Sequence, residues 1–192
     1  MEKKKIILGS ASPRRQELLK KLGFEFTVAT IDCPEVYPPE LPPADIAGYL
    51  SKLKSESYDQ LNDGELLITA DTVVVLNDRI LGKPADADEA YDMLYRLSGT
   101  IHQVYTGVTI RSTENTVTAT DFASVEFDEF TSTEIKEYIK DCKPFDKAGA
   151  YGIQEWAGMA KMKYINGSFY TIMGLPTHLV YTILKDFGQT PF

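Results

Sequence analysis

The sequence contains few of the residues that build disulfide frameworks or protein metal clusters. Of 192 residues, only two are cysteine and two are histidine. Cys33 and Cys142 stand far apart, without a second pair or a Cys-x-x-Cys spacing, so neither a disulfide scaffold nor a zinc site is expected. We expect two reduced thiols in a cytoplasmic protein.

Long hydrophobic runs and excess positive charge are also lacking. The apolar stretch at 6–8 is shorter than the roughly 7 to 15 residues of a signal-peptide core, and no run approaches the roughly 18 that span a bilayer. Twenty Lys and Arg face twenty-eight Asp and Glu, which gives a net charge of -8. This balance argues against nucleic acid or a membrane surface as partner, so any bound phosphate needs a local cluster of cations.

What is present predicts an α/β protein with a mixed, twisted sheet flanked by helices. We expect one domain over residues 1–192, with two lobes around one cleft, because 43% hydrophobic content can supply a sizeable core. Capping and periodicity predict helices that start after Ser12, Asp86, Thr131 and Pro176, and one across 44–58. Strands are expected over 4–9, 24–29 and 66–76, as two long antiparallel strands within 101–127, after the loop at 143–154, and in a hairpin at 166–167.

The first candidate site is the segment Gly9-Ser10-Ala11-Ser12-Pro13-Arg14-Arg15, a small-residue turn between a strand and a helix. Backbone N–H groups and the helix dipole favour an anion there. Arg14 and Arg15 would oppose the dipole unless a phosphate binds, and arginine is a bidentate phosphate donor. The alternative is a capped helix with two solvated arginines.

The second candidate is Asp71, a carboxylate inside an apolar strand, with Lys83 beyond a turn expected at Asn77-Asp78. A carboxylate here suits metal binding or proton transfer, and a lysine suits phosphate neutralisation. A structural ion pair is the alternative.

The third candidate is the glycine-rich loop from Lys143 to Gln154. The amide of Gln154 offers donors and an acceptor, which suits recognition of a base edge. The glycines of the loop could equally serve only tight turns. His102 and His178 are isolated, and we expect them to be structural or exposed.

Taken in order, these segments resemble the Maf family of nucleotide pyrophosphatases over nearly the whole chain. The segments that carry the resemblance are Ser10 to Leu19, Lys54, Ala70 to Val74, Leu81 to Pro84, Leu97 to Gly99, His102, Thr106 to Val108, Asp146 to Gln154, Gly167-Ser168 and Gly174 to Pro176.

The resemblance implies a fold similar to that of inosine triphosphatase, with a deep cleft and often a homodimer. It also implies hydrolysis of nucleoside triphosphates to monophosphate and pyrophosphate with a divalent cation, Mg or Mn. The family's catalytic aspartate falls on Asp71, and Glu35 is the loop carboxylate expected to bind metal with it. The phosphate-contacting positions fall on Ser12, Arg14, Arg15, Lys54 and Lys83.

Within the family, Arg14, Thr72 and Gln154 are similar to the branch that acts on dTTP and UTP. We therefore expect these substrates, with modified pyrimidine nucleotides as further candidates. A neutral glutamine can pair with the imide edge of thymine or uracil through one donor and one acceptor. The alternatives are a pyrophosphatase for 7-methyl-GTP and a nucleotide-binding regulator of cell division, which would need the phosphate cradle but not Asp71.

Overall fold

The computed structural model describes residues 3–192 and divides the chain into two compact units. Unit 1 contains the described residues up to Asp71, together with Thr106–Asp121 and Gly174–Phe192. Unit 2 contains Thr72–Tyr105 and Phe122–Met173. The prediction of a single domain with two lobes stays a prediction.

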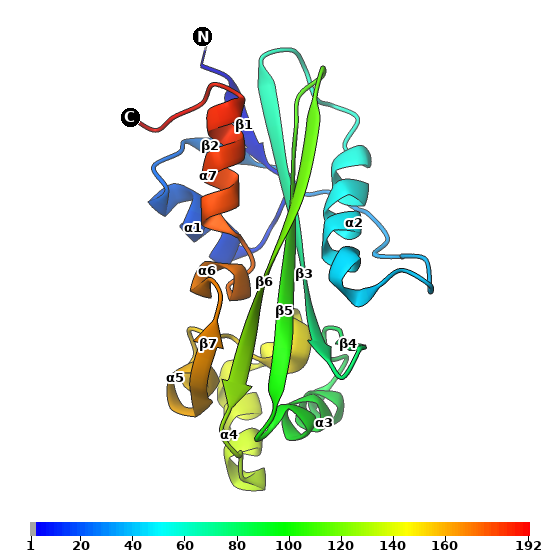
Figure 1. Ribbon diagram of the computed structural model, residues 1–192, viewed down its shortest axis with the longest axis vertical. Coiled ribbons are helices and arrows are strands. Elements are labelled where there is room, and N and C mark those ends of the chain that lie inside the picture. Colours follow the sequence, from blue (N-terminus) through cyan, green and yellow to red (C-terminus); the bar gives the residue numbers. More distant parts are fainter. Residues whose placement is uncertain (1–2) are drawn as a thin grey trace. The chain divides into compact units, whose positions relative to one another are not determined.

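One mixed sheet of seven strands confirms the expected α/β class (Figure 1). Its order is β2-β1-β3-β5-β6-β7, with β4 paired to β3. Strand β1 is parallel to β2 and β3, whereas the β3–β4 and β6–β7 pairs are antiparallel. The bounds are β1 Lys5–Leu8, β2 Phe26–Val28, β3 Glu65–Leu76, β4 Arg79–Leu81, β5 Ile101–Arg111, β6 Thr116–Phe127 and β7 Met162–Asn166.

Helices cover both faces of the strands in unit 1. Helices α1 (Pro13–Lys21) and α7 (Thr177–Asp186) lie on one side, and α2 (Pro43–Glu56) lies on the other (Figure 1). Each helix buries an apolar stripe, as the 3.6-residue periodicity predicts. The buried residues of these stripes include Leu18, Leu19, Ile46, Leu50, Val180, Ile183 and Leu184.

Strand β5 approaches helix α2 closely because Gly107 has no side chain. A Cβ atom built at Gly107 would overlap the backbone carbonyl of Ala47 in α2. The glycine therefore lets α2 lie directly on the strand. This contact sets how closely α2, the helix that carries Lys54, approaches β5.

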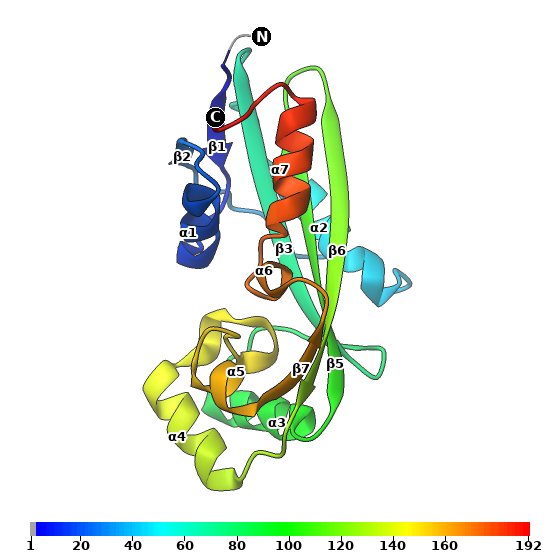
Figure 2. The ribbon, with the colours of Figure 1, turned by 60° about the vertical axis from the view of Figure 1, so that its left-hand side comes forward.

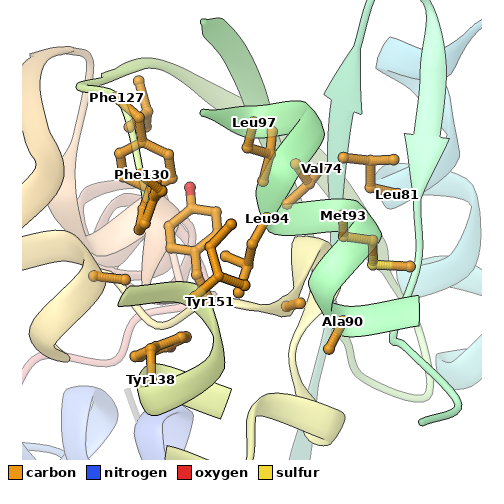
Figure 3. Close-up of a cluster of buried hydrophobic side chains, with 14 of the residues drawn as sticks. Val74, Leu81, Ala90, Met93, Leu94, Leu97, Phe127, Phe130, Tyr138 and Tyr151 are labelled. Atoms are coloured by element: carbon orange, nitrogen blue, oxygen red, sulfur yellow. The ribbon is translucent and has the colours of Figure 1, made fainter. Parts of the chain in front are cut away.

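Unit 2 packs short helices around a second core (Figures 2 and 3). Its helices are α3 Ala87–Leu97, α4 Ser132–Cys142, α5 Trp156–Lys161 and α6 Phe169–Ile172, with 3-10 turns η1 Pro144–Asp146 and η2 Ala148–Ala150. In the core, the Phe127 ring meets the rings of Phe130 and Tyr151 edge-on, at centroid distances of 5.4 and 4.9 Å. Leu94 and Leu97 of α3 are fully buried in the same cluster.

Two predicted helix starts in unit 2 are confirmed by their caps. The Asp86 carboxylate accepts a hydrogen bond from the Glu89 amide at 2.9 Å at the start of α3. Thr131 and Glu134 form the expected capping box of α4, with each side chain accepting from the other's backbone amide.

Two sequence predictions about unit 2 are wrong. Asn166-Gly167 does not turn a hairpin, because β7 ends there and the chain continues into α6. Gly167 instead permits close approach to β6, since a Cβ atom would lie 2.7 Å from the Cβ of Ala123. The loop at 143–154 leads into helix α5 rather than a strand, and Gly158 lets that helix fold against the backbone of Ile153.

Across residues 3–192, none of the helices combines the length and apolar character needed to cross a bilayer.

Candidate active site

The loop between β1 and α1 brings small residues and arginines to the start of a helix in unit 1. Pro13 occupies the first turn of α1, as predicted, and the Gln16 amide donates to the Ser12 carbonyl at 3.2 Å. Within the described chain, the Ser12 side chain makes no capping hydrogen bond. Ser12 therefore stands at the expected position, with its hydroxyl not used to cap the helix.

Hydrogen bonds to two separate segments of unit 1 hold the Arg15 side chain in place. Its Nε donates to the Gly174 carbonyl at 2.7 Å, and its Nη1 lies 3.3 Å from Ser10 Oγ. Burial lowers the pKa of Arg15 below its usual value, and the charge of Asp71 is the main opposing influence. The guanidinium is thus a fixed cation, since arginine stays protonated in proteins.

The centre of the site in unit 1 is one ammonium shared by two carboxylates. Lys54, in the last turn of α2, donates to Glu35 Oε1 at 2.8 Å and forms a short ion pair with Asp71 Oδ1. The Asp71 and Lys54 side chains are 8% and 15% exposed, whereas that of Glu35 is 43% exposed. The structure therefore brings together Asp71, which the strand pattern had already indicated, with Lys54 and Glu35, which only the family resemblance assigned to the site.

A row of buried hydroxyls holds α2 against the strands of unit 1. Thr69 lies two residues before Asp71 in β3, and its Oγ1 donates to the Ser51 carbonyl at 2.7 Å. Ser51 Oγ donates to the Gly48 carbonyl at 2.8 Å and lies 2.9 Å from Thr109 Oγ1. Because Thr69 and Asp71 share one face of β3, these bonds connect the strand of Asp71 to the helix of Lys54.

The C-terminal end of α2 is bound by Arg111 of β5. Its Nη2 donates to the carbonyls of Ser55 and Tyr58 at 2.6 and 2.5 Å, and its Nε donates to Ser55 Oγ at 3.1 Å. Ser55 lies in the last turn of α2, where carbonyls lack i+4 partners, and Tyr58 lies just beyond the helix. These bonds fix the last turn of α2, next to Lys54.

Thr72, Lys83 and Gln154 belong to unit 2. Thr72 is half-buried in β3, while Lys83 and Gln154 are exposed. The Gly149 amide donates to the Gly82 carbonyl at 3.0 Å, so the segment of Lys83 is bound to the glycine-rich loop.

The loop that carries Gln154 is held by a buried polar network in unit 2. The Tyr138 hydroxyl donates to Glu155 Oε2 at 2.5 Å and accepts from the Gly152 amide at 3.0 Å. Lys147 Nζ lies 3.1 Å from Glu155 Oε1. Burial, followed by the bond to Glu155, raises the pKa of Tyr138 above its usual value of 10, so the hydroxyl stays protonated.

Sequence reasoning missed these supporting residues. Tyr138 and Ser51 read as ordinary positions of amphipathic helices, and Thr69 reads as a strand residue. A signal was available only for Lys147 and Glu155. Lys147 is a charged residue inside the glycine-rich loop, and Glu155 is a charged residue directly after it.

Asp71 and Glu35 fit the donor set of a divalent cation. Among the described residues there is no cluster of three or more His, Cys, Asp or Glu side chains that could hold a metal alone. Magnesium, however, is often held by one or two carboxylates completed by substrate phosphates and water. Two carboxylates that converge on one ammonium match that pattern.

Comparison with known proteins shows the family of the chain. Residues 5–187 match the profile of the Maf-like proteins. A dTTP/UTP pyrophosphatase of Porphyromonas gingivalis is 46% identical, with 99% of this chain and 98% of the relative covered. A dTTP/UTP pyrophosphatase of Bacteroides thetaiotaomicron is 48% identical, with coverage of 96% and 97%. The structure of the Staphylococcus aureus Ham1 protein is 18% identical, with a TM-score of 0.47 over 65% of this chain and 72% of that one. The chain belongs to the Maf family.

Proposed function

We propose that the protein hydrolyses dTTP and UTP to the nucleoside monophosphate and pyrophosphate. The observation that carries the proposal is the convergence of Asp71 and Glu35 on Lys54 in a chain whose relatives are named dTTP/UTP pyrophosphatases. These groups supply the two things that phosphoryl transfer demands of a protein, positioning and charge stabilisation.

A divalent cation, Mg or Mn, is proposed as cofactor, held by Asp71 and Glu35. When bound, it would polarise phosphate oxygens and lower the pKa of coordinated water.

The protein's own groups have separate roles in the proposed reaction. Water forms a bond to the α-phosphorus as the bond to the pyrophosphate oxygen breaks, and Asp71 orients the water and accepts the proton that it loses. One carboxylate can serve as base and as metal ligand, so Asp71 needs no second acid–base partner. Lys54 and Arg15 stabilise the charge that develops on the leaving pyrophosphate.

The remaining assigned residues are proposed to bind substrate. Ser12 and Arg14 lie at the start of α1, where backbone amides and the dipole favour phosphate. Lys83 is proposed to neutralise phosphate charge. Thr72 and Gln154 are proposed to select the pyrimidine base, with Gln154 pairing to the imide edge.

The test incubates the protein with magnesium or manganese and, separately, dTTP, UTP, CTP, GTP and 7-methyl-GTP. Monophosphate, pyrophosphate and free phosphate are quantified. We expect equal amounts of monophosphate and pyrophosphate, formed fastest from dTTP and UTP. Release of free phosphate, or preference for 7-methyl-GTP, would contradict the proposal.

The matched variant is Asp71→Asn, which keeps the size of the side chain and removes its charge. Loss of one transition-state charge contact costs on the order of 2 to 4 kcal/mol, so turnover should fall about 30- to 1000-fold. An unchanged circular dichroism spectrum would show that the fold is intact. Retained nucleotide binding with no turnover by the wild type under any metal would favour a binding regulator instead.

A further inference from the structure

The carboxylates proposed to hold the metal already share a cation. Lys54 Nζ bonds to Glu35 at 2.8 Å and pairs with Asp71, and it comes from a different element than either. The Lys54 side chain is only 15% exposed. It is therefore directed into the gap between two carboxylates rather than toward solvent.

Electrostatics explains why the chain places a cation there. Two neighbouring carboxylates repel each other, and removal from water strengthens the repulsion. Asp71 is almost fully buried, so its charge must be balanced by cations of the protein when no metal is present. Arg15 interacts with that charge, and Lys54 pairs with it directly. Lys54 bonds to both carboxylates and holds both side chains in place.

We propose that Lys54 is a built-in counter-ion that occupies the place of the divalent cation between Asp71 and Glu35 in the metal-free protein. Entry of the metal displaces the ammonium from the carboxylates. The released ammonium then pairs with the substrate's phosphates, a last step that rests on the proposed function. Lys54 thus assembles the metal site and also competes with the metal for it.

This arrangement has a consequence opposite to that of an ordinary binding-site lysine. A cation that must leave before the metal enters weakens metal binding. Its removal should therefore tighten the binding of metal to the free protein, although it impairs turnover. A lysine that only contacts phosphate would leave metal affinity in the absence of nucleotide unchanged.

The first experiment measures Mn²⁺ binding to the nucleotide-free protein by electron paramagnetic resonance. Lys54→Met keeps the length of the side chain and removes the ammonium. We expect Mn²⁺ to bind about tenfold more tightly to this variant than to the wild type, because two carboxylates lose their competing cation. Adding Glu35→Gln should remove most of that gain.

Lys52→Met is the matched control for the lost charge. Lys52 lies on the same helix, is 55% exposed and pairs with Glu56 at 3.7 Å. Its removal changes the net charge equally, but exposed charges at a distance are largely screened, so Mn²⁺ affinity should stay within about twofold of the wild type. Unchanged or weaker binding by Lys54→Met would overturn the proposal, and so would the absence of measurable Mn²⁺ binding by both proteins.

A second experiment uses the wild type alone and so does not depend on a variant that folds. Mass spectrometry follows the acetylation rate of each lysine with and without Mg²⁺. Lys54 should be protected in the metal-free protein and react several-fold faster with Mg²⁺, whereas the rate at Lys52 should not change. A Lys54 rate that Mg²⁺ leaves unchanged or lowers would contradict displacement. Neither experiment contains nucleotide, so a failure of the counter-ion proposal is distinct from a failure of the proposed hydrolysis.

Discussion

His102 is a titratable residue placed in the apolar core of unit 2. It is 1% exposed, its Nε2 lies 2.8 Å from the Tyr151 hydroxyl, and its ring centroid is 5.0 Å from that of Phe127. No described residue bonds to its Nδ1. Burial lowers the pKa of His102 from 6.5 to about 3, so the folded protein keeps the ring neutral.

This pKa predicts how stability depends on pH. The unfolded chain takes up a proton on His102 below about pH 6.5, whereas the folded protein does not until about pH 3. The free energy of unfolding should therefore fall as the pH falls, by roughly 1.4 kcal/mol per pH unit below pH 6. Urea unfolding of the wild type between pH 7 and 5 measures this slope.

Two variants separate this effect from other titrations. His102→Leu should lower stability at pH 7 and flatten the slope. His178→Gln, at the other histidine, whose side chain is 57% exposed, is the matched control for replacing a histidine. Glu134 titrates outside the window because its pKa is lowered to about 2, chiefly by Lys161. A wild-type stability that is flat from pH 7 to 5 would show that His102 does not titrate as described.

At the scale of single residues, the sequence predicts the charged residues of the site better than the residues that hold them in place. Asp71 was recognisable because a carboxylate interrupted an apolar strand. Its bond to Lys54 depends on how α2 lies against β3, which spacing along the chain does not reveal. The neutral, buried state of His102 likewise depends on neighbours from distant segments, such as Tyr151.

Helix α2 is the element that sets the distance between Lys54 and Asp71. We predict that Thr69→Val, which removes the hydroxyl bonded to the Ser51 carbonyl, lowers stability by about 1 to 2 kcal/mol and lowers kcat by about tenfold. The KM for dTTP should change much less, since no substrate contact is removed. Steady-state kinetics and urea unfolding measure both effects.

Thr118→Val is the matched control for this prediction. Thr118 bonds to Thr109 Oγ1 at 2.9 Å but not to α2. It should leave kcat close to the wild-type value, and Thr69→Ser should restore most of the activity. If Thr118→Val and Thr69→Val reduced kcat equally, the hydroxyls would stabilise the fold without positioning the site.

The loop before α5 is a second element with a testable role. Tyr138→Phe removes the hydroxyl that joins Glu155 to the Gly152 amide, next to Gln154. If Gln154 selects the base, the ratio of kcat/KM for dTTP to that for CTP should fall, by about fivefold or more, since a donor in a well-made site is worth 1 kcal/mol or more.

Tyr151→Phe provides the comparison in the same core. It removes the hydroxyl that bonds to His102 and leaves the bonds of Glu155 in place. Both variants delete one buried hydroxyl, but only Tyr138→Phe should change the substrate ratio. Equal substrate ratios in both variants and the wild type would argue against this role of the loop.

The sequence predicted most elements because their signals are local. The capping box of α4 and the apolar stripe of α3 each depend on residues close together in the sequence, and both predictions are confirmed. The failed predictions are the hairpin at Asn166-Gly167 and the strand expected after the loop at 143–154, and both segments depend on tertiary contacts. Gly167 has the pattern of a hairpin turn but permits approach to Ala123, and the contact of Gly158 with Ile153 depends on the path of α5.

At the scale of the whole molecule, the mixed sheet could be predicted but the division of the chain could not. Each of β3, β5 and β6 contributes residues to both compact units, so the units have interleaved sequence ranges. No linker in the sequence marks a boundary between such units. Residues assigned from one ordered set of motifs accordingly fall into different units, as Asp71 and Thr72 do at adjacent positions.

Continuity of three strands through both units predicts one cooperative unfolding transition. Trp156, the only tryptophan, lies in unit 2, so its fluorescence reports that unit, whereas far-ultraviolet circular dichroism reports the helices and strands of both. We expect the two signals to give the same urea midpoint and the same dependence on denaturant. The reason is that β3, β5 and β6 run through both units, so neither unit has a complete sheet of its own. A fluorescence transition displaced from the circular dichroism transition would mean that the units unfold separately, and the prediction of a single domain over residues 1–192 would then be wrong.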